Sequence, residues 1–259
     1  LKEWIEARKR NGEKDDPRLE NAESLYYYFY SIGTGAIGIS TLNSIGKTKL
    51  DLLKRFRNVF SLSYQRYIDI TKAEKQAREA QIEAALERVR ARTMAMQKSD
   101  ELADVATLLF RQVNDLGIKP WTTGFNIWSD DNNAYEDWIA SPGGGFIEPY
   151  VIDATAFSEF KALSDAKKSG TEFFIRDQEG EILQETYKQL SRFATKNQFE
   201  KILEEGFEFP SRQFVHMVFG PKVSLMFITY EPVPEAHDIF KRFGKVFEQT
   251  YTRFLDLQK

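Results

Sequence analysis

The chain contains the same helical segment twice. Residues 51–72 align without a gap on residues 238–259, and ten of the 22 positions are identical. The identical pairs are Asp51/Asp238, Lys54/Lys241, Arg55/Arg242, Phe56/Phe243, Val59/Val246, Phe60/Phe247, Tyr64/Tyr251, Arg66/Arg253, Asp69/Asp256 and Lys72/Lys259. Such a repeat predicts serial units that each close with the same amphipathic helix. Because the sequence starts without Met and stops at Lys259 in the middle of an expected helix, we expect it to be part of a longer modular protein.

The composition allows a sizeable core and excludes several classes of function. Of the 259 residues, 42% are hydrophobic and 14% aromatic, which suits one large domain or two ordinary ones. A net charge of −3 argues against a nucleic-acid surface. The absence of cysteine excludes disulfides, thiolate catalysis, thiolate metal sites and a covalently linked bilin pigment. No apolar run approaches 18 residues, so we expect no membrane span and a cytoplasmic location.

The order of expected elements predicts an α+β fold, an antiparallel sheet with flanking helices. A short charged helix precedes a hairpin of strands within 24–42, and a long helix covers 47–98. The remaining elements are helix 101–118, strands 122–130, 134–141 and 146–153, helix 155–170, strand 171–177, a mostly helical stretch 180–205, strands 212–220 and 222–231, and helix 234–259.

These elements divide into three parts. Residues 1–50 form the C-terminal part of a first unit, residues 51–98 its closing helix and a linker, and residues 99–259 a complete second unit. Gly33 aligns with Gly220 at the offset of the repeated helix, which supports this division. Because the hairpin lacks its upstream neighbours, we expect its edge strands to pair with another chain or to be covered by residues 1–23.

The long helix has the pattern of a coiled coil. No proline or glycine follows Gly46 within it, and small or apolar residues recur at spacings of three and four, first in one phase and then in a slightly shifted one. We expect a homodimer through residues 51–98, and the alternative is a single solvated helix held by its charge pairs. The expected dimer seam consists of Ile70, Ala77, Ala84, Leu86, Val89 and Met96.

The linker and the helix after it carry a resemblance. The stretch KAEKQAREAQIEAALERVRARTMAMQKSDELADVATLLFRQVNDLGI is similar to the segments that join units in bacterial sensor histidine kinases and related two-component proteins. The layout of the following residues resembles a GAF-type sensory domain. The resemblance implies a role in sensing or dimerisation, but it supplies no ligand and no catalytic motif.

Aromatic residues of the second unit suggest a ligand pocket. The candidate residues are Phe125, Trp128, Trp138, Phe174, Arg176 and His216, with Arg176 as a partner for an anionic group. Ordinary core packing is the alternative for the aromatic residues, and a buried structural histidine is the alternative for His216. His237 resembles a phospho-acceptor, but Leu50 occupies its place in the first copy. We find no catalytic residues and no metal-ligand spacing, and the cofactor is unknown.

We therefore expect a non-enzymatic sensory and signal-transducing region that dimerises and binds a small molecule in its second unit. The alternative function is an interaction and dimerisation scaffold without a small-molecule ligand. A hydrolase would need a triad around His216, and no activated nucleophile accompanies that residue in the sequence.

Overall fold

The computed structural model describes residues 2–12, 14, 16–19, 22–194, 202–204 and 206–257. The chain divides into two compact units, Leu1–Ala77 and Arg78–Lys259. Helix α2 (Lys47–Met94) begins in the first unit and ends in the second. Residues 195–201, 205, 258 and 259, which the sequence assigns to helices, lie outside the described residues.

The N-terminal unit consists of a hairpin beside a helix. Its elements are α1 (Lys2–Arg10), the 3-10 turn η1 (Pro17–Leu19), β1 (Tyr26–Ser31), β2 (Ala36–Thr41) and the first part of α2. Strands β1 and β2 form a two-stranded antiparallel sheet. The hydroxyl of Tyr28 accepts a hydrogen bond from the backbone N–H of Ile45 at 3.1 Å, and the Arg57 guanidinium lies over the Tyr30 ring. One face of the hairpin is thereby fixed against the start of α2.

The C-terminal unit contains the larger sheet. Its helical elements are the end of α2, η2 (Ser99–Glu101), α3 (Leu102–Asp115), α4 (Ser158–Lys168), α5 (Gly180–Phe193), η3 (Pro234–Ala236) and α7 (His237–Leu257). Its strands are β3 (Pro120–Trp128), β4 (Ala134–Ala140), β5 (Phe146–Asp153), β6 (Phe173–Glu179), β7 (Arg212–Phe219) and β8 (Val223–Thr229). The strand order is β5-β4-β3-β8-β7-β6, and every pair is antiparallel. The α+β expectation is confirmed.

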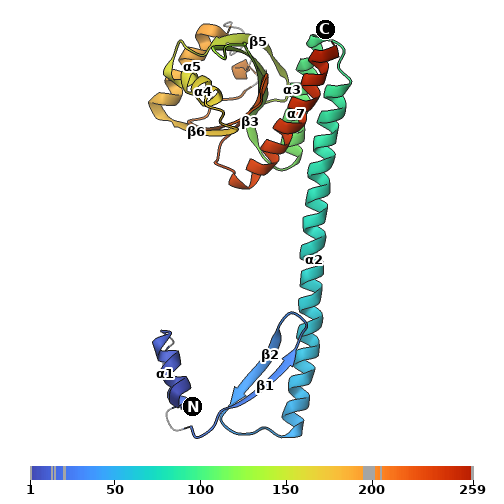
Figure 1. The fold of residues 1–259 in the computed structure, drawn as a ribbon, viewed down its shortest axis with the longest axis vertical. Coiled ribbons are helices and arrows are strands. Elements are labelled where there is room, and N and C mark those ends of the chain that lie inside the picture. Colours follow the sequence, from blue (N-terminus) through green and yellow to red (C-terminus); the bar gives the residue numbers. More distant parts are fainter. Residues whose placement is uncertain are drawn as a thin grey trace. The chain divides into compact units, whose positions relative to one another are not determined.

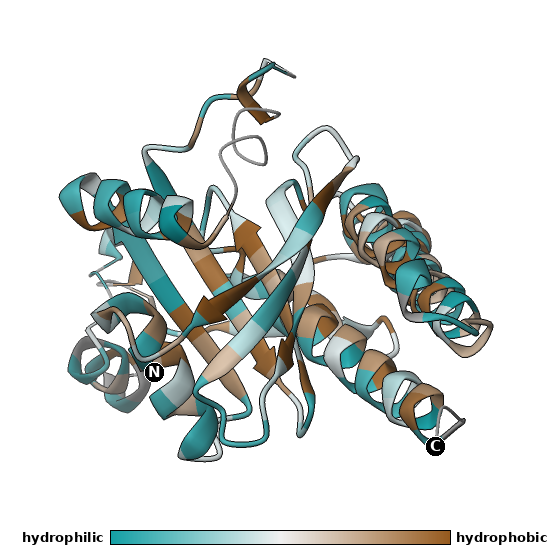
Figure 2. Ribbon diagram, turned by 90° about the horizontal axis from the view of Figure 1, so that it is seen from above, coloured by the Kyte–Doolittle hydropathy of each residue, from teal (hydrophilic) through white to brown (hydrophobic). Residues whose placement is uncertain are grey.

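Each face of this sheet carries its own hydrophobic core. Side chains of α3, α7 and the end of α2 pack on one face against residues such as Phe125 and Phe227. On the other face, residues of α4 and the segment after α5 pack against residues such as Trp121 and Met226. Figure 1 shows α3 and α7 on one side of the sheet with α4 and α5 on the other. In Figure 2 the hydrophobic segments concentrate on strands of the sheet, while the helices alternate between hydrophobic and hydrophilic residues.

The repeat in the sequence is also a repeat in the structure. In the first copy Tyr26 is paired with Thr41, and in the second Phe214 is paired with Thr229, so the two hairpins have the same register at an offset of 188 residues. The repeated helix has an offset of 187, so the first copy has one residue more than the second between its hairpin and its helix. The predicted match of Gly33 with Gly220 is therefore wrong by one position. The Gly220 turn, closed by the N–H of Gly220 and the carbonyl of Val223, corresponds to the turn closed by Ile32 and Gly35.

The two copies of the repeated helix differ in how far their aromatic side chains are buried. Phe243 and Phe247 are 0% exposed, whereas their counterparts Phe56 and Phe60 are 61% and 46% exposed. On the hairpin, the described part of residues 1–23 leaves Phe29 64% exposed. Pairing of this hairpin with another chain remains a prediction.

Half of the expected dimer seam is used inside the chain. Leu86, Val89 and Met96 are buried with α3 and α7 in the core of the C-terminal unit. The seam prediction is wrong for these three residues, because α2 ends at Met94 and the chain turns back, so that α3 covers this part of α2. Ile70, Ala77 and Ala84 are exposed in the single chain.

Candidate functional site: a cavity under the sheet

A cavity of about 80 Å³ lies on the sheet face that α4 and α5 cover. Most of its wall is apolar or aromatic. The aromatic and apolar residues that line it include Trp121, Tyr135, Ile139, Tyr150, Phe160, Leu163, Tyr187, Phe209, Met226 and Ile228. The strand residues among them converge because alternate residues of β3, β4, β5, β7 and β8 point to the same face of a sheet, and Phe160, Leu163 and Tyr187 come from the covering helices α4 and α5. An apolar hollow with a few polar groups is the usual form of a small-molecule site.

Asp137 is the most unusual residue of the wall. It stands in β4, is 4% exposed, and accepts a hydrogen bond from the Asn126 Nδ2 at 2.7 Å. Burial raises the pKa of its carboxyl to about 7, against the lowering effect of hydrogen bonds from Tyr150 and Asn126. Burial, followed by the nearby Asp137 charge, raises the pKa of the Tyr150 phenol well above its usual value. Asp137 therefore changes its charge near neutral pH inside a largely apolar space.

A second polar group of the wall is already paired. Arg176 Nη1 donates to the backbone carbonyl of Glu159 at 2.7 Å and to its Oε2 at 2.8 Å. Gln178 donates to the same carboxylate at 3.0 Å, Gln213 donates to Gln178, and the Tyr187 hydroxyl donates to Gln213 at 2.6 Å. This chain of hydrogen bonds links α4, β6, β7 and α5, and it engages the Arg176 guanidinium that the sequence suggested for an anion.

The six predicted pocket residues do not line one cavity. Arg176 lines it, while Trp128 and Phe174 pack on the same face of the sheet outside its wall. Phe125 and Trp138 belong to the core on the opposite face, where their rings stack with centroids 6.0 Å apart. Their separation follows from strand parity, because Trp128 and Phe125 are three positions apart in β3 and so point to opposite faces.

His216 also lies on the opposite face from the cavity. It is fully buried, its ring is near those of Phe240 and His237, and its Nε2 is 2.9 Å from the Thr229 hydroxyl. Burial, followed by the charge of His237, lowers the pKa of His216 to about 4. The position agrees with the alternative of a structural histidine, which is neutral at physiological pH.

The sequence analysis missed Asp137 although its signal was present. Tyr135, Asp137 and Ile139 share one face of β4, so a carboxylate stands between two apolar residues at inward positions. An acidic residue at a buried strand position is uncommon without a partner. By sequence alone this aspartate is one of several acidic residues near a hairpin turn, because its burial depends on α4, α5 and β5.

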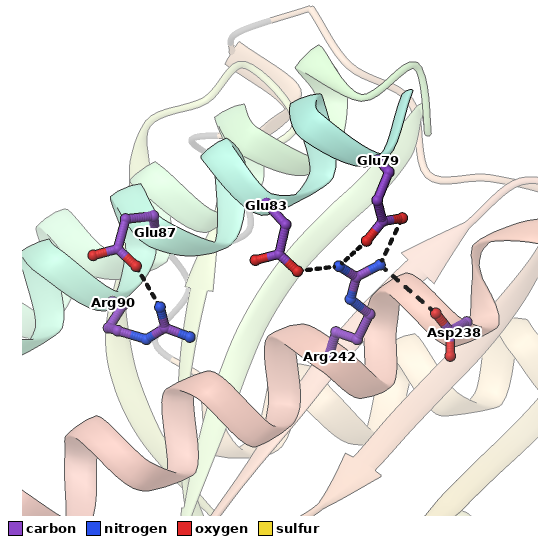
Figure 3. A network of polar contacts seen from close by, with 6 residues as sticks. All are labelled: Glu79, Glu83, Glu87, Arg90, Asp238 and Arg242. Atoms are coloured by element: carbon purple, nitrogen blue, oxygen red, sulfur yellow. Dashed lines mark hydrogen bonds and ion pairs between the residues drawn. The ribbon is translucent and has the colours of Figure 1, made fainter. Parts of the chain in front are cut away.

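Helix α7 and the end of α2, which pack on the same face of the sheet, are joined by an ion-pair network. Arg242 of α7 donates to Glu79 Oε1 at 2.7 Å and also to Glu83, both on α2 (Figure 3). The hydrogen bond from Arg242 lowers the pKa of the Glu79 carboxyl. Glu87 and Arg90 form a separate pair within α2 (Figure 3). The Arg242 network links α7 to this part of α2.

Within the described ranges, no three or more acidic or histidine side chains are placed to hold a metal ion. No helix among the described residues is both long and apolar enough to cross a bilayer. Comparison of the sequence with known protein families and with curated proteins finds no match.

Proposed function

We propose that this chain is a non-enzymatic sensory segment of a signalling protein of the bacterial two-component type, in which the C-terminal unit binds a small molecule. The observation that carries this proposal is the cavity, an apolar and aromatic hollow with a few convergent polar groups. Cavities of about 150 Å³ hold molecules the size of benzene, so a cavity of about 80 Å³ suits a smaller compound.

A binding role suits the cavity better than a catalytic one. The hydroxyl of Thr122 donates to the carbonyl of Ala140, and that of Thr186 donates to the carbonyl of Ile182. Neither hydroxyl faces a base that could activate it, and the described lining residues include no histidine. Other polar side chains of the wall, such as Arg176, Glu159 and Gln178, are hydrogen-bonded to one another.

The sheet offers a route from the cavity to the helices. In β4, Asp137 faces the cavity, and the next residue, Trp138, stacks on Phe125, whose ring lies 4.7 Å from that of Phe247 in α7. A ligand that favours one of two arrangements of β4 would bias the position of α7. We infer that α7 and α2, which Arg242 joins, are the output elements of this unit.

The exposed positions of α2 in the N-terminal unit support dimerisation. Ile70, Ala73 and Ala77 follow the spacing of a coiled-coil seam and are exposed in the single chain. We propose that the chain is a homodimer whose interface includes these positions and excludes Leu86, Val89 and Met96. The N-terminal unit would then be the closing part of another GAF-like unit, which the shared hairpin register supports.

The cavity is tested by filling it. Ile228 lines the cavity from β8, so Ile228→Phe reduces its volume, whereas Val151→Phe adds the same ring at an exposed position of β5. Ligand-observed NMR with a library of small compounds should detect binders for the wild type and for Val151→Phe, and none for Ile228→Phe. Leu163→Phe, on α4, fills the cavity from another wall if Ile228→Phe does not fold.

Two results would overturn the sensory role. The first is a folded wild type that binds no compound, and the second is an unchanged set of binders after the cavity is filled. In either case the scaffold alternative, in which the chain only dimerises and spaces other modules, would take its place.

The dimer is tested by light scattering on Ile70→Glu with Ala77→Glu. This pair puts two charges on the proposed seam and should give a monomer with unchanged helix content. Asn58→Glu with Gln65→Glu adds the same charge at exposed positions away from the seam and should remain a dimer. A wild-type monomer, or a seam variant that stays dimeric, would contradict this part of the proposal.

A further inference from the structure

The chemistry of the cavity wall indicates which molecules it would bind. Among the lining residues that the structure describes, the charged side chains are Asp137, Glu159 and Arg176. Glu159 and Arg176 form an ion pair at 2.8 Å and neutralise each other. Asp137 is held by neutral donors, Asn126 and Tyr150, so its charge has no cationic partner in that group.

The surroundings of Asp137 are rich in aromatic rings. Tyr135 and Tyr150 line the cavity with it, and further rings of the wall come from Trp121, Phe160, Tyr187 and Phe209. The electron-rich faces of such rings attract cations, most strongly where water is excluded. A buried carboxylate beside aromatic rings is the combination that recognises an organic ammonium group.

We propose that the cavity binds a small organic cation, a compact alkylammonium ion of fewer than six heavy atoms, whose charge is paired with the Asp137 carboxylate. This inference rests on the proposed sensory function and names the ligand class for the same site. An anion is disfavoured because Arg176 is already paired with Glu159.

Binding of a cation would be linked to loss of a proton. The carboxyl of Asp137 has a pKa raised to about 7 by burial, so at lower pH a bound proton competes with the ligand. For one group with this pKa, linkage predicts that the apparent affinity for a cation rises about tenfold between pH 6 and pH 8. A neutral ligand of the same shape should show no such gain.

The experiment compares two probes of nearly equal size, ethylammonium and ethanol, by NMR titration of the full chain at pH 6 and pH 8. Ethylammonium should bind more tightly than ethanol, and its affinity should rise with pH. Sodium chloride at the same ionic strength controls for general salt effects. Methylammonium extends the series to a smaller cation.

Variants identify the group responsible. Asp137→Asn keeps the size of the side chain and should weaken ethylammonium binding at least tenfold at pH 8 while ethanol binding is retained. Asp165→Asn removes an exposed carboxylate of α4 and should change neither. Circular dichroism should show that both variants are folded.

The outcomes separate this inference from the proposed function. If ethanol binds as well as the cation, or Asp137→Asn leaves the cation affinity unchanged, the cation assignment is wrong and the small-molecule site stands. If neither these probes nor the compound library binds the folded wild type, both the assignment and the sensory function are wrong.

Discussion

Asp137 and Trp138 are consecutive residues of β4 that lie on opposite faces of the six-stranded sheet. The Asp137 carboxyl borders the cavity, and the Trp138 ring stacks on Phe125 in the core beneath α7. Because adjacent strand residues are joined through one backbone, a displacement of one moves the other. This pair places the Asp137 carboxyl one residue from the core that packs against α7.

We expect Asp137→Asn to make folding stability less dependent on pH. The pKa of Asp137 is raised from 3.8 to about 7, so between these values the folded state binds more protons than the unfolded state. Stability of the wild type should therefore fall as the pH rises from about 4 to 7, by about 1.4 kcal/mol for each pH unit in that range. The asparagine side chain cannot ionise, so the variant should gain stability relative to the wild type as the pH rises. Urea unfolding at pH 5 and pH 8, followed by tryptophan fluorescence, measures the difference; equal pH slopes would contradict it.

The repeat supplies a matched pair of phenylalanines. Phe247→Ala removes a fully buried ring that contacts Phe125, and it should lower the free energy of unfolding of the C-terminal unit by about 3–5 kcal/mol. Phe60→Ala changes the aligned residue of the first copy, which is 46% exposed, and should cost less than about 1 kcal/mol in the monomer. Thermal unfolding checks both. A large loss from Phe60→Ala in a monomer would show that another part of the chain covers this face.

Gly244 allows α7 to approach β7 closely. A Cβ atom at this position would collide with the Val218 side chain, so Gly244→Ala should destabilise the unit by about 1–3 kcal/mol despite the better helix propensity of alanine. Val218→Ala should partly restore stability when combined with Gly244→Ala, giving a coupling energy in a double-mutant cycle. Lys245→Ala, at the next and exposed position, is the control. A neutral effect of Gly244→Ala would rule out this close contact.

Arg242→Gln should loosen the contact between α7 and α2. The variant loses the bonds to Glu79 and Glu83, and hydrogen exchange of residues 79–86 should become faster. The fall in the unfolding midpoint should be small beside that of Phe247→Ala, because the pair is partly exposed and screened by salt. Arg90→Gln removes a pair within α2 and should leave this exchange unchanged. Equal exchange in both variants would exclude a bridging role for Arg242.

The sequence alone determined the order and type of the elements, because their signals are local. Periodicity in 101–118 predicted a helix with Leu102, Val105, Leu108, Leu109 and Val113 on one face, and α3 buries all of them except Leu108, which is partly buried. Strand alternation and turn residues located the hairpins in the same way. The repeat of residues 51–72 predicted serial units that close with the same helix; the two hairpins that precede the copies share one register, and the division into such units stays a prediction.

Only the tertiary structure decided which part of the protein packs against each face of a helix or strand. The heptad spacing of α2 is the same whether its apolar residues meet a partner chain or α3 and α7 of the same chain, so the sequence could not assign Leu86 and Val89. Strand parity divides residues between two faces but does not say which face encloses a cavity. That choice depends on α4 and α5, which cover Asp137 from distant parts of the chain and thereby raise its pKa to about 7. Burial is a property of the assembled fold, and the chemistry of this site follows from burial.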